Sequence, residues 1–405
     1  MERKKDIVLA ILFFVFLSVT VISTRTWNEF VDLLTLCVTQ NSENGPKTSE
    51  DGSSSLTIST ISDEILDKLI CKNMLVELSG TIMKSLGVQS YYNTTAGINI
   101  TSDGYNIGQY SKTSTHYEVE QMIDFKEYLD GRGTNLLYVS LPVKYIDDVY
   151  YQQEFGGNSF VNSNTDLFLS RIEQAGISYI DLRNNIIEEQ LEPLSLFYRT
   201  DHHWTVPASK WAAKIISERL NRSFGYNIDL RLFDDSNFNS VYYENAWLGE
   251  QGKKVAKSYI GLDDYTMMEP MYETSYTITG TSGVVESDFS GFINKEVYNL
   301  DANPYASPSW HYSYIPHKEC NIHNNNAGYG KVLVLGDSYS TPMIPFLTLG
   351  IQDVRLIVPR DLSDTTIRQI VEAGDYDTVI IAYAQFMIGA HDSESNANYK
   401  MFDLK

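Results

Sequence analysis

The segment 198–205 reads Tyr-Arg-Thr-Asp-His-His-Trp-Thr and concentrates groups that can do acid–base chemistry. It places a carboxylate, two imidazoles and an indole in consecutive positions, at Asp201, His202, His203 and Trp204. In an extended loop, residues two apart face the same way, so Asp201 can lie beside His203 and fix its tautomer. The other ring nitrogen of His203 is then free to accept a proton, as in a general base. The alternative is a surface loop whose polar residues only cap a helix.

A base of this kind needs a nucleophile, and the best candidate is Ser338, which closes a Gly-Asp-Ser sequence. The continuous apolar run 332–335 precedes it and is typical of a buried parallel strand, while residues 342–349 predict a short helix. A serine between such a strand and helix lies where open α/β sheets place their ligand crevice. Its backbone N–H is positioned to stabilise a developing oxyanion. The alternative is an ordinary turn serine.

The Thr-Asp-His-His-Trp-Thr run, followed far downstream by Gly-Asp-Ser, resembles the SGNH-like enzymes of the alginate O-acetyltransferase group, and within it the DHHW proteins of Gram-positive bacteria. The group's Asp-x-His-Trp pattern maps onto Asp201, His203 and Trp204, and the family serine maps onto Ser338. The motif order is permuted relative to ordinary SGNH hydrolases, as in the acetyltransferase branch. The resemblance covers roughly residues 105–400.

The resemblance implies O-acetyl transfer to an extracellular polysaccharide, with acetyl groups delivered by a membrane-bound O-acyltransferase partner. The residues alone predict acyl transfer or ester hydrolysis by a covalent serine route without a cofactor, in which Ser338, His203 and Asp201 are catalytic. Two alternatives stay open: a carbohydrate acetylesterase of the same fold, and a non-catalytic glycan-binding or assembly protein.

Other residues are weaker candidates for contacts with the substrate. At the end of the last predicted strand, Tyr383 or Gln385 is a candidate for the second oxyanion donor. Trp204 is a further substrate candidate, and Lys144 and Arg199 are plausible substrate-facing cations, although such residues are more often solvated surface charges.

Strands and helices alternate from residue 116 onward. Buried-strand patterns are predicted over 135–141, 178–182, 332–335, 353–358 and 378–383. Amphipathic helices are predicted over 119–130, 166–175, 206–221, 342–349 and 364–373. This alternation favours an SGNH-like three-layer α/β/α domain with a parallel sheet, spanning 105–405.

The stretch 222–330 is too long for a plain loop and interrupts the alternation. It is rich in Tyr, Asn and Gly, so we expect a β-rich insertion whose hairpins form a lid or wall beside the crevice. Trp247, Tyr305 and Trp310 are candidates for sugar contacts there.

A partial zinc pattern lies in the same insertion. It comprises His317, Cys320 and His323, with His311 upstream, and no second pair of ligands at structural-site spacing accompanies it. We expect no metal there. Nor do we expect one at the adjacent imidazoles of 202–203, since neighbours on an extended segment point apart.

Composition narrows the classes of partner. The chain has 405 residues, a formal net charge of −21 and 28 tyrosines, with a pI of about 4.7. Because no basic stripe can displace counterions from phosphates, nucleic acid is excluded as a partner. Three cysteines are too few for a disulfide framework.

The N-terminus has the pattern of a targeting segment. Three basic residues, 3–5, precede an apolar run from Ile7 to Ile22. We therefore expect an uncleaved signal anchor over 1–24, with a cleaved signal peptide as the alternative. A flexible linker over 25–60 and a helical stalk or packing segment over 61–104 would follow, placing the catalytic domain outside the cell membrane.

Overall fold

The computed structural model describes the residues 72–91, 98–280, 283–314 and 320–405. The expected signal segment and linker, 1–60, lie outside the described residues. The segment expected to be helical over 61–104 is described from residue 72 onward: it begins with the helix α4 (Lys72–Ser85) but also contains the short strands β1 (Ser90–Tyr91) and β2 (Ile98–Ile100). None of the helices in the described ranges combines the length and apolar character that a membrane span needs. The chain divides into two compact units, 1–82 and 83–405, and the second unit holds everything that follows.

An eight-stranded sheet forms the centre of the second unit, in the strand order β5-β4-β13-β11-β12-β10-β8-β9. Five neighbouring strands run parallel: β4 (Asn135–Leu141), β5 (Ser178–Asp181), β11 (Lys331–Gly336), β12 (Asp353–Ile357) and β13 (Thr378–Ala384). These are the five strands that the apolar runs predict. Every residue of β13 is buried, as expected for a central strand covered on both faces.

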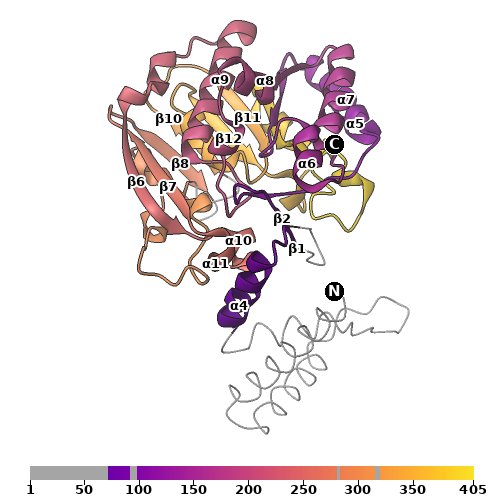
Figure 1. Cartoon of the computed structure of the whole chain (residues 1–405). Coiled ribbons are helices and arrows are strands. Elements are labelled where there is room, and N and C mark those ends of the chain that lie inside the picture. Colours follow the sequence, from indigo (N-terminus) through magenta and orange to yellow (C-terminus); the bar gives the residue numbers. More distant parts are fainter. Residues whose placement is uncertain (1–71, 92–97, 281–282, 315–319) are drawn as a thin grey trace, which may run out of the picture. The chain divides into compact units, whose positions relative to one another are not determined.

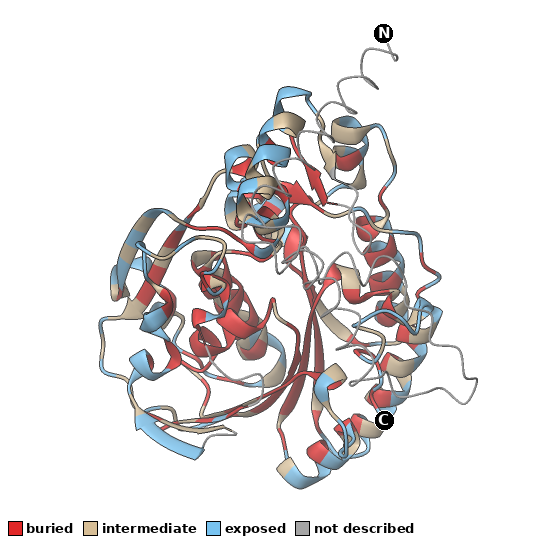
Figure 2. Ribbon diagram, turned by 90° about the horizontal axis from the view of Figure 1, so that it is seen from below, coloured by how far each residue is buried: buried red, intermediate tan, exposed pale blue. Residues whose placement is uncertain are grey.

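Helices cover both faces of this sheet (Figure 2). One face packs against α5 (His116–Asp130), α7 (Val161–Gln174) and α13 (Ile367–Gly374). The other packs against α9 (Val206–Phe224) and α12 (Ile344–Leu347). Alternate residues along β13 enter different cores, which is the period-two pattern of a strand between two layers. The predicted three-layer α/β/α arrangement is confirmed.

The five predicted strands are parallel, but the insertion adds antiparallel strands that the prediction of a parallel sheet did not include, so the complete sheet is mixed. The hairpin β8 (Tyr276–Gly280) and β9 (Gly283–Ser287) joins through β10 (Cys320–Asn324), which pairs antiparallel with β12. A second long pair, β6 (Phe238–Trp247) and β7 (Asp263–Pro270), stands apart from the sheet (Figure 1). Hairpins are present, as expected, but one of them is part of the sheet and not a separate wall.

Short elements complete the second unit. They are β1 (Ser90–Tyr91), β2 (Ile98–Ile100), β3 (Asn106–Ile107), α6 (Asp148–Phe155), α8 (Leu182–Glu188), α10 (Glu250–Val255) and α11 (Lys257–Ile260). Of these, α10 matters most for the site, because its first residues contact the loop that carries Asp201.

Candidate active site

The loops that carry His203 and Ser338 meet, although 135 positions separate these two residues. The indole Nε1 of Trp204 donates a hydrogen bond of 2.8 Å to the carbonyl of Tyr339. The hydroxyl of Tyr339 donates in return to the carbonyl of His202. Trp204 is 1% exposed, and leaving its buried N–H unpaired would cost about 1–3 kcal/mol. Trp204 therefore holds the two loops together and is not open to a substrate.

Asp201 orients His203 as the spacing predicts. Nδ1 of His203 lies 2.6 Å from Oδ1 of Asp201, and the backbone N–H of His203 donates to the same oxygen at 3.1 Å. The second carboxylate oxygen accepts from the backbone N–H of Glu250 at 3.0 Å. The Nε2 atom of His203 is buried and bonds to no group in the described part of the chain. With its proton on Nδ1, the ring therefore offers Nε2 as a proton acceptor.

Electrostatics keep this ring neutral. Burial, followed by the neighbouring His202 and His311, lowers the pKa of His203 well below its usual value, against the opposing effect of Asp201. Burial would raise the pKa of Asp201, but His203 and its other imidazole neighbours outweigh burial and lower it. An ionised carboxylate beside a neutral imidazole is the starting state of a general base.

Asp337 shapes the turn at the end of β11. Its Oδ1 accepts from the backbone N–H groups of Tyr339 and Ser340, at 2.9 and 3.2 Å. Its Oδ2 accepts from Ala384 N at 2.7 Å, which fastens the turn to the neighbouring strand β13. Burial raises the pKa of Asp337 to about 6. Ser338 is only half-buried between two buried neighbours, so the turn presents its side chain outward.

Two further residues reach this centre from the insertion, on the turn 310–313. The ring of His311 stacks on that of His203, with centroids 3.5 Å apart and an interplanar angle of 10°. Its Nε2–H donates to the carbonyl of Ser338 at 2.8 Å. Tyr312 lies edge-on to His203, with ring centroids 5.7 Å apart. The sequence offers no signal for these roles beyond the outlying place of His311 in the zinc pattern.

The insertion also supports the backbone beside Asp201. The N–H groups of Gly249 and Gly252 donate to the Thr200 hydroxyl and carbonyl, at 2.6 and 2.8 Å. A Cβ atom at Gly249 would lie 2.5 Å from Cβ of Asp201, so only glycine permits this approach. Asp263, the first residue of β7, accepts from the backbone N–H of Thr200 at 2.9 Å. The position of the acid thus depends on residues far away in the sequence.

Lys144 and Arg199 hold structure, contrary to their prediction as substrate-facing cations. Lys144 is buried, and its Nζ donates to the carbonyls of Asn106 and Arg199 at 2.8 and 3.4 Å. Burial lowers the pKa of Lys144 to about 7. The guanidinium of Arg199 donates to the carbonyl of Ile260 at 2.8 Å. Both cations brace the start of the 198–205 segment.

Tyr383 and Gln385 are also engaged inside the fold. The Tyr383 hydroxyl donates to the carbonyl of Met401 at 2.8 Å, in the core layer beneath α5 and α7. The side-chain oxygen of Gln385 accepts from Val143 N at 2.9 Å, and its amide nitrogen donates to Thr165 at 3.0 Å. Neither side chain has a free donor for an oxyanion, so the structure does not support them in that role.

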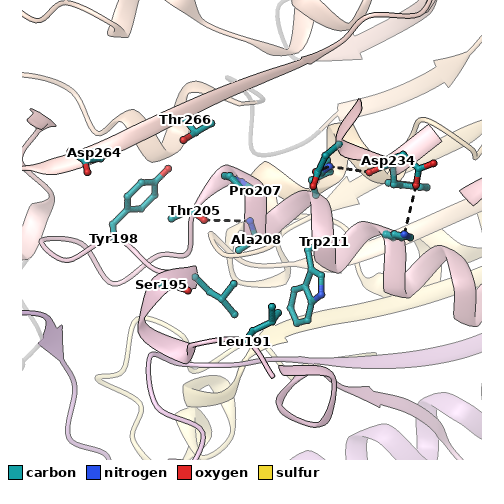
Figure 3. A pocket seen from close by; sticks show the side chains of 15 residues that line it. Leu191, Ser195, Tyr198, Thr205, Pro207, Ala208, Trp211, Asp234, Asp264 and Thr266 are labelled. Atoms are coloured by element: carbon teal, nitrogen blue, oxygen red, sulfur yellow. Dashed lines mark hydrogen bonds and ion pairs between the residues drawn. The ribbon is translucent and has the colours of Figure 1, made fainter. Parts of the chain in front are cut away.

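Two of the three predicted sugar contacts need a similar correction. Trp247 and Trp310 are 1% and 0% exposed, so neither ring can stack on a sugar. Tyr305 accepts a hydrogen bond from the backbone N–H of Lys257 at 3.0 Å. A cavity of about 520 Å³ lies at the N-terminal end of α9, and Trp211 lines it (Figure 3). That cavity contains none of the three predicted catalytic side chains.

The residues of the zinc pattern do not converge where they are described. Cys320 and His323 are three apart on β10 and so lie on opposite faces of the strand, and His323 pairs with Asp353 at 2.8 Å. His317 lies outside the described residues. The rings of His202 and His203 are 3.8 Å apart, so the expectation that they point apart is wrong. Their Nδ1 atoms are already engaged, with Gln251 at 2.8 Å and Asp201 at 2.6 Å.

Comparisons with known proteins bear on the fold and on the segment that carries Asp201 and His203. Residues 102–231 match the family model of the SGNH hydrolase-like domain of the acetyltransferase AlgX. No curated protein sequence matches the chain. PatB1 of Bacillus cereus, solved with a sulfonyl adduct, is similar at a TM-score of 0.62 and 16% identity, over 78% of this chain and 99% of that one. A DHHW family protein from Eubacterium siraeum is similar at a TM-score of 0.56 and 16% identity, over 77% and 97%.

The two structures share the fold, and the family match covers the Asp-x-His-Trp segment itself. The resemblance stated from the motifs is thereby confirmed: residues 102–231 are similar to an SGNH hydrolase-like acetyltransferase domain, and the described fold is that of PatB1 and a DHHW family protein.

Proposed function

We propose that this protein is an extracytoplasmic O-acyltransferase that O-acetylates a cell-surface or secreted polysaccharide. One observation carries the proposal: a neutral imidazole, oriented by the buried carboxylate of Asp201, lies on a loop fastened to the turn that presents Ser338. The match of residues 102–231 to an acetyltransferase domain supports acetyl as the group transferred.

The proposed reaction has two steps, acylation of Ser338 and transfer of the acyl group to an acceptor. His203 Nε2 takes the proton of the Ser338 hydroxyl while the serine oxygen bonds to the carbonyl carbon of an acetyl ester. The carbonyl electron pair moves to oxygen and forms the tetrahedral oxyanion, near the Ser338 backbone N–H. The oxyanion then collapses, the bond to the leaving oxygen breaks, and His203 returns its proton to that oxygen. Asp201 stabilises the imidazolium throughout.

An acceptor hydroxyl then reverses the sequence. His203 removes its proton, the hydroxyl oxygen bonds to the acyl carbon, and Ser338 Oγ leaves with the proton that His203 returns. A sugar hydroxyl gives transfer and water gives hydrolysis. The acetylesterase alternative therefore differs from the proposal only in which acceptor reaches the acyl-enzyme.

The delivery of acetyl groups belongs to the same proposal. A catalytic domain outside the cell has no cytoplasmic acetyl donor, so a membrane-bound O-acyltransferase would supply the acetyl group. The basic residues and apolar run over 1–24 support an N-terminal anchor beside such a partner. In cells that carry the protein, external protease should degrade the catalytic domain while the membrane stays intact. Full protection from protease would contradict this location.

An acetyl-transfer assay separates the three candidate functions. The protein is incubated with an acetylated chromogenic ester, with and without a neutral oligosaccharide. Acetylated glycan in the presence of acceptor supports the transferase. Free acetate alone, at a rate that the acceptor does not change, supports the esterase. Glycan binding without either product, retained in Ser338→Ala, supports the non-catalytic alternative.

A further inference from the structure

We propose that His311 and Tyr312, which lie in the insertion, both contribute to catalysis at this centre. In this inference, Tyr312 donates a hydrogen bond to the oxyanion, and His311 is a positioning residue that aligns the base with the nucleophile. The inference rests on the proposed serine acyl-transfer function. It names residues that neither the Asp-x-His-Trp and Gly-Asp-Ser motifs nor the family match contain, since both residues lie outside 102–231.

His311 joins the two halves of the site through separate contacts. Its ring covers the face of His203 at a centroid distance of 3.5 Å, nearly parallel. Its Nε2–H holds the carbonyl of Ser338 at 2.8 Å. His311 is 1% exposed, so this geometry is fixed by packing and not by solvent. A shift of either loop must therefore break a contact with this one ring, which couples the position of the base to that of the serine.

Tyr312 is placed to act on the reacting atoms. It is 47% exposed, in contrast to its neighbour His311, so its side chain is reachable by a substrate. Burial and Asp201 raise the pKa of Tyr312, while an interaction of its hydroxyl with the Ser338 side chain lowers it, and the net shift is upward. The phenol therefore remains a protonated donor at neutral pH, on a ring that lies edge-on to His203 with the ring centroids 5.7 Å apart.

The geometry of the attack links that position to the oxyanion. Once the Ser338 oxygen bonds to the acyl carbon, the oxyanion is attached to the same carbon, so a donor beside one oxygen lies close to the other. Tyr312 O–H and the Ser338 backbone N–H then donate together. The phenol keeps its proton, and no further reactant is needed. This pair replaces Tyr383 and Gln385, whose donors are used inside the fold.

The first test removes only the phenolic oxygen. In Tyr312→Phe, kcat for an acetyl ester should fall about 100-fold because one of two oxyanion donors is lost. KM should stay within about twofold, since the donor acts in the transition state. Tyr329→Phe is the matched control, because Tyr329 is also exposed and packs on Tyr226, remote from this centre. A fall in kcat of less than about tenfold in Tyr312→Phe would overturn the oxyanion role.

The second test separates stacking from hydrogen bonding at His311. His311→Phe keeps an aromatic ring but loses the donor to Ser338, whereas His311→Gln keeps an amide donor. We expect His311→Gln to retain several-fold more kcat than His311→Phe, at equal melting temperature. Rates are normalised to the fraction of protein that a sulfonyl fluoride labels at Ser338, so that misfolded protein does not count.

The pH profile gives a readout that a purely structural role would not move. The charged and titratable groups that face His203 are Asp201, His202, His311, Tyr312 and Tyr339. Because His311 lowers the pKa of His203, the acid limb of kcat/KM should move to higher pH in His311→Gln. Equal losses in the glutamine and phenylalanine variants, with an unmoved acid limb, would overturn the positioning role.

Failure of this inference differs visibly from failure of the proposed function. If the wild-type protein neither turns over an acetyl ester nor takes up the sulfonyl label, the acyl-transfer function itself fails. If the wild type does both and the Tyr312 and His311 variants match it, the function stands and only the assignment of these two residues is wrong.

Discussion

At the residue scale, the central relation is between one carboxylate and two adjacent imidazoles. Asp201 accepts from Nδ1 of His203 at 2.6 Å, whereas its Oδ1 is 3.5 Å from Nδ1 of His202. His203 is 2% exposed and His202 is 37% exposed at the side chain. The structure thus distinguishes the buried ring of His203, the proposed base, from its half-exposed neighbour His202.

Alanine at the two imidazoles should therefore have unequal effects. His203→Ala removes the proton acceptor and should lower kcat by about a thousandfold or more. His202→Ala loses a contact with Gln251 and should cost about tenfold or less. Steady-state kinetics on an acetyl ester measure both. Equal losses would mean that the base has been assigned to the wrong ring or that both rings only maintain structure.

The lowered pKa of His203 has a consequence for pH dependence. A base whose pKa lies below the ordinary value of 6.5 stays neutral, and thus competent, as the pH falls below 6.5. The acid limb of kcat/KM should accordingly lie below pH 6.5. An acid limb at or above pH 6.5 would show that the pKa of His203 is not lowered in the way the structure indicates. The profile must be read on kcat/KM, because that parameter reports the free enzyme.

Burial of His311 makes the free energy of unfolding depend on pH. Its pKa is lowered to about 4, chiefly by burial, so the unfolded chain binds a proton that the folded chain rejects. The free energy of unfolding should fall as the pH drops from 6.5 towards 4, by up to ~3 kcal/mol from this group. In His311→Gln the loss of stability between pH 7 and 5 should be smaller. Parallel denaturant melts test this, and identical pH slopes would contradict it.

At the scale of elements, the sequence predicts the strands and helices of the three layers well. It predicts poorly which distant segments hold the loops of Asp201 and Ser338 in place. The five parallel strands follow from continuous apolar runs, and α9 follows from its Thr205 cap and apolar period. These signals are local. The contacts of Gly249, Asp263 and His311 with the loops that carry Asp201 and Ser338 connect segments that only the complete fold brings together, so no local pattern reveals them.

The errors in the site prediction have the same physical origin. Position at a strand end placed Tyr383 near the crevice, but the strand's alternation turns its side chain to the opposite face from α9. Lys144 was expected to meet substrate or solvent, yet backbone carbonyls satisfy its ammonium group inside the fold. The type and approximate location of each residue could be predicted from the sequence. The direction in which its side chain points and the groups that it contacts could not.

A prediction follows for the contact between α10 and the acid. Gly249→Ala would place a methyl group 2.5 Å from Cβ of Asp201 and 2.6 Å from the backbone of Thr200. The backbone of Thr200 cannot move away from the added methyl group without displacing the chain. The Asp201 loop should therefore shift, and kcat should fall by about tenfold or more. Gly328→Ala is the matched control, since nothing lies within 4 Å of its added methyl. Equal activity of the two variants would refute this role of α10.

At the scale of the whole molecule, charge bears on the acceptor. With a formal net charge of −21, the protein repels polyanions, and this repulsion weakens as salt shortens the Debye length. For an anionic polysaccharide, KM should decrease as ionic strength rises. For a neutral glycan it should not change. Rates on a small uncharged ester at each salt concentration provide the control. A KM for the anionic glycan that rises with salt would instead indicate a local basic groove.

Detection of an acyl-enzyme tests the proposed role of Ser338 most directly. The protein is mixed with an activated acetyl ester, quenched in acid within a single turnover, digested and mapped by mass spectrometry. We expect one acetyl group on the peptide of Ser338, absent from Ser338→Ala and strongly reduced in His203→Ala. Acetyl transfer to a glycan at an unchanged rate in Ser338→Ala, or acetylation at another residue in its place, would contradict it.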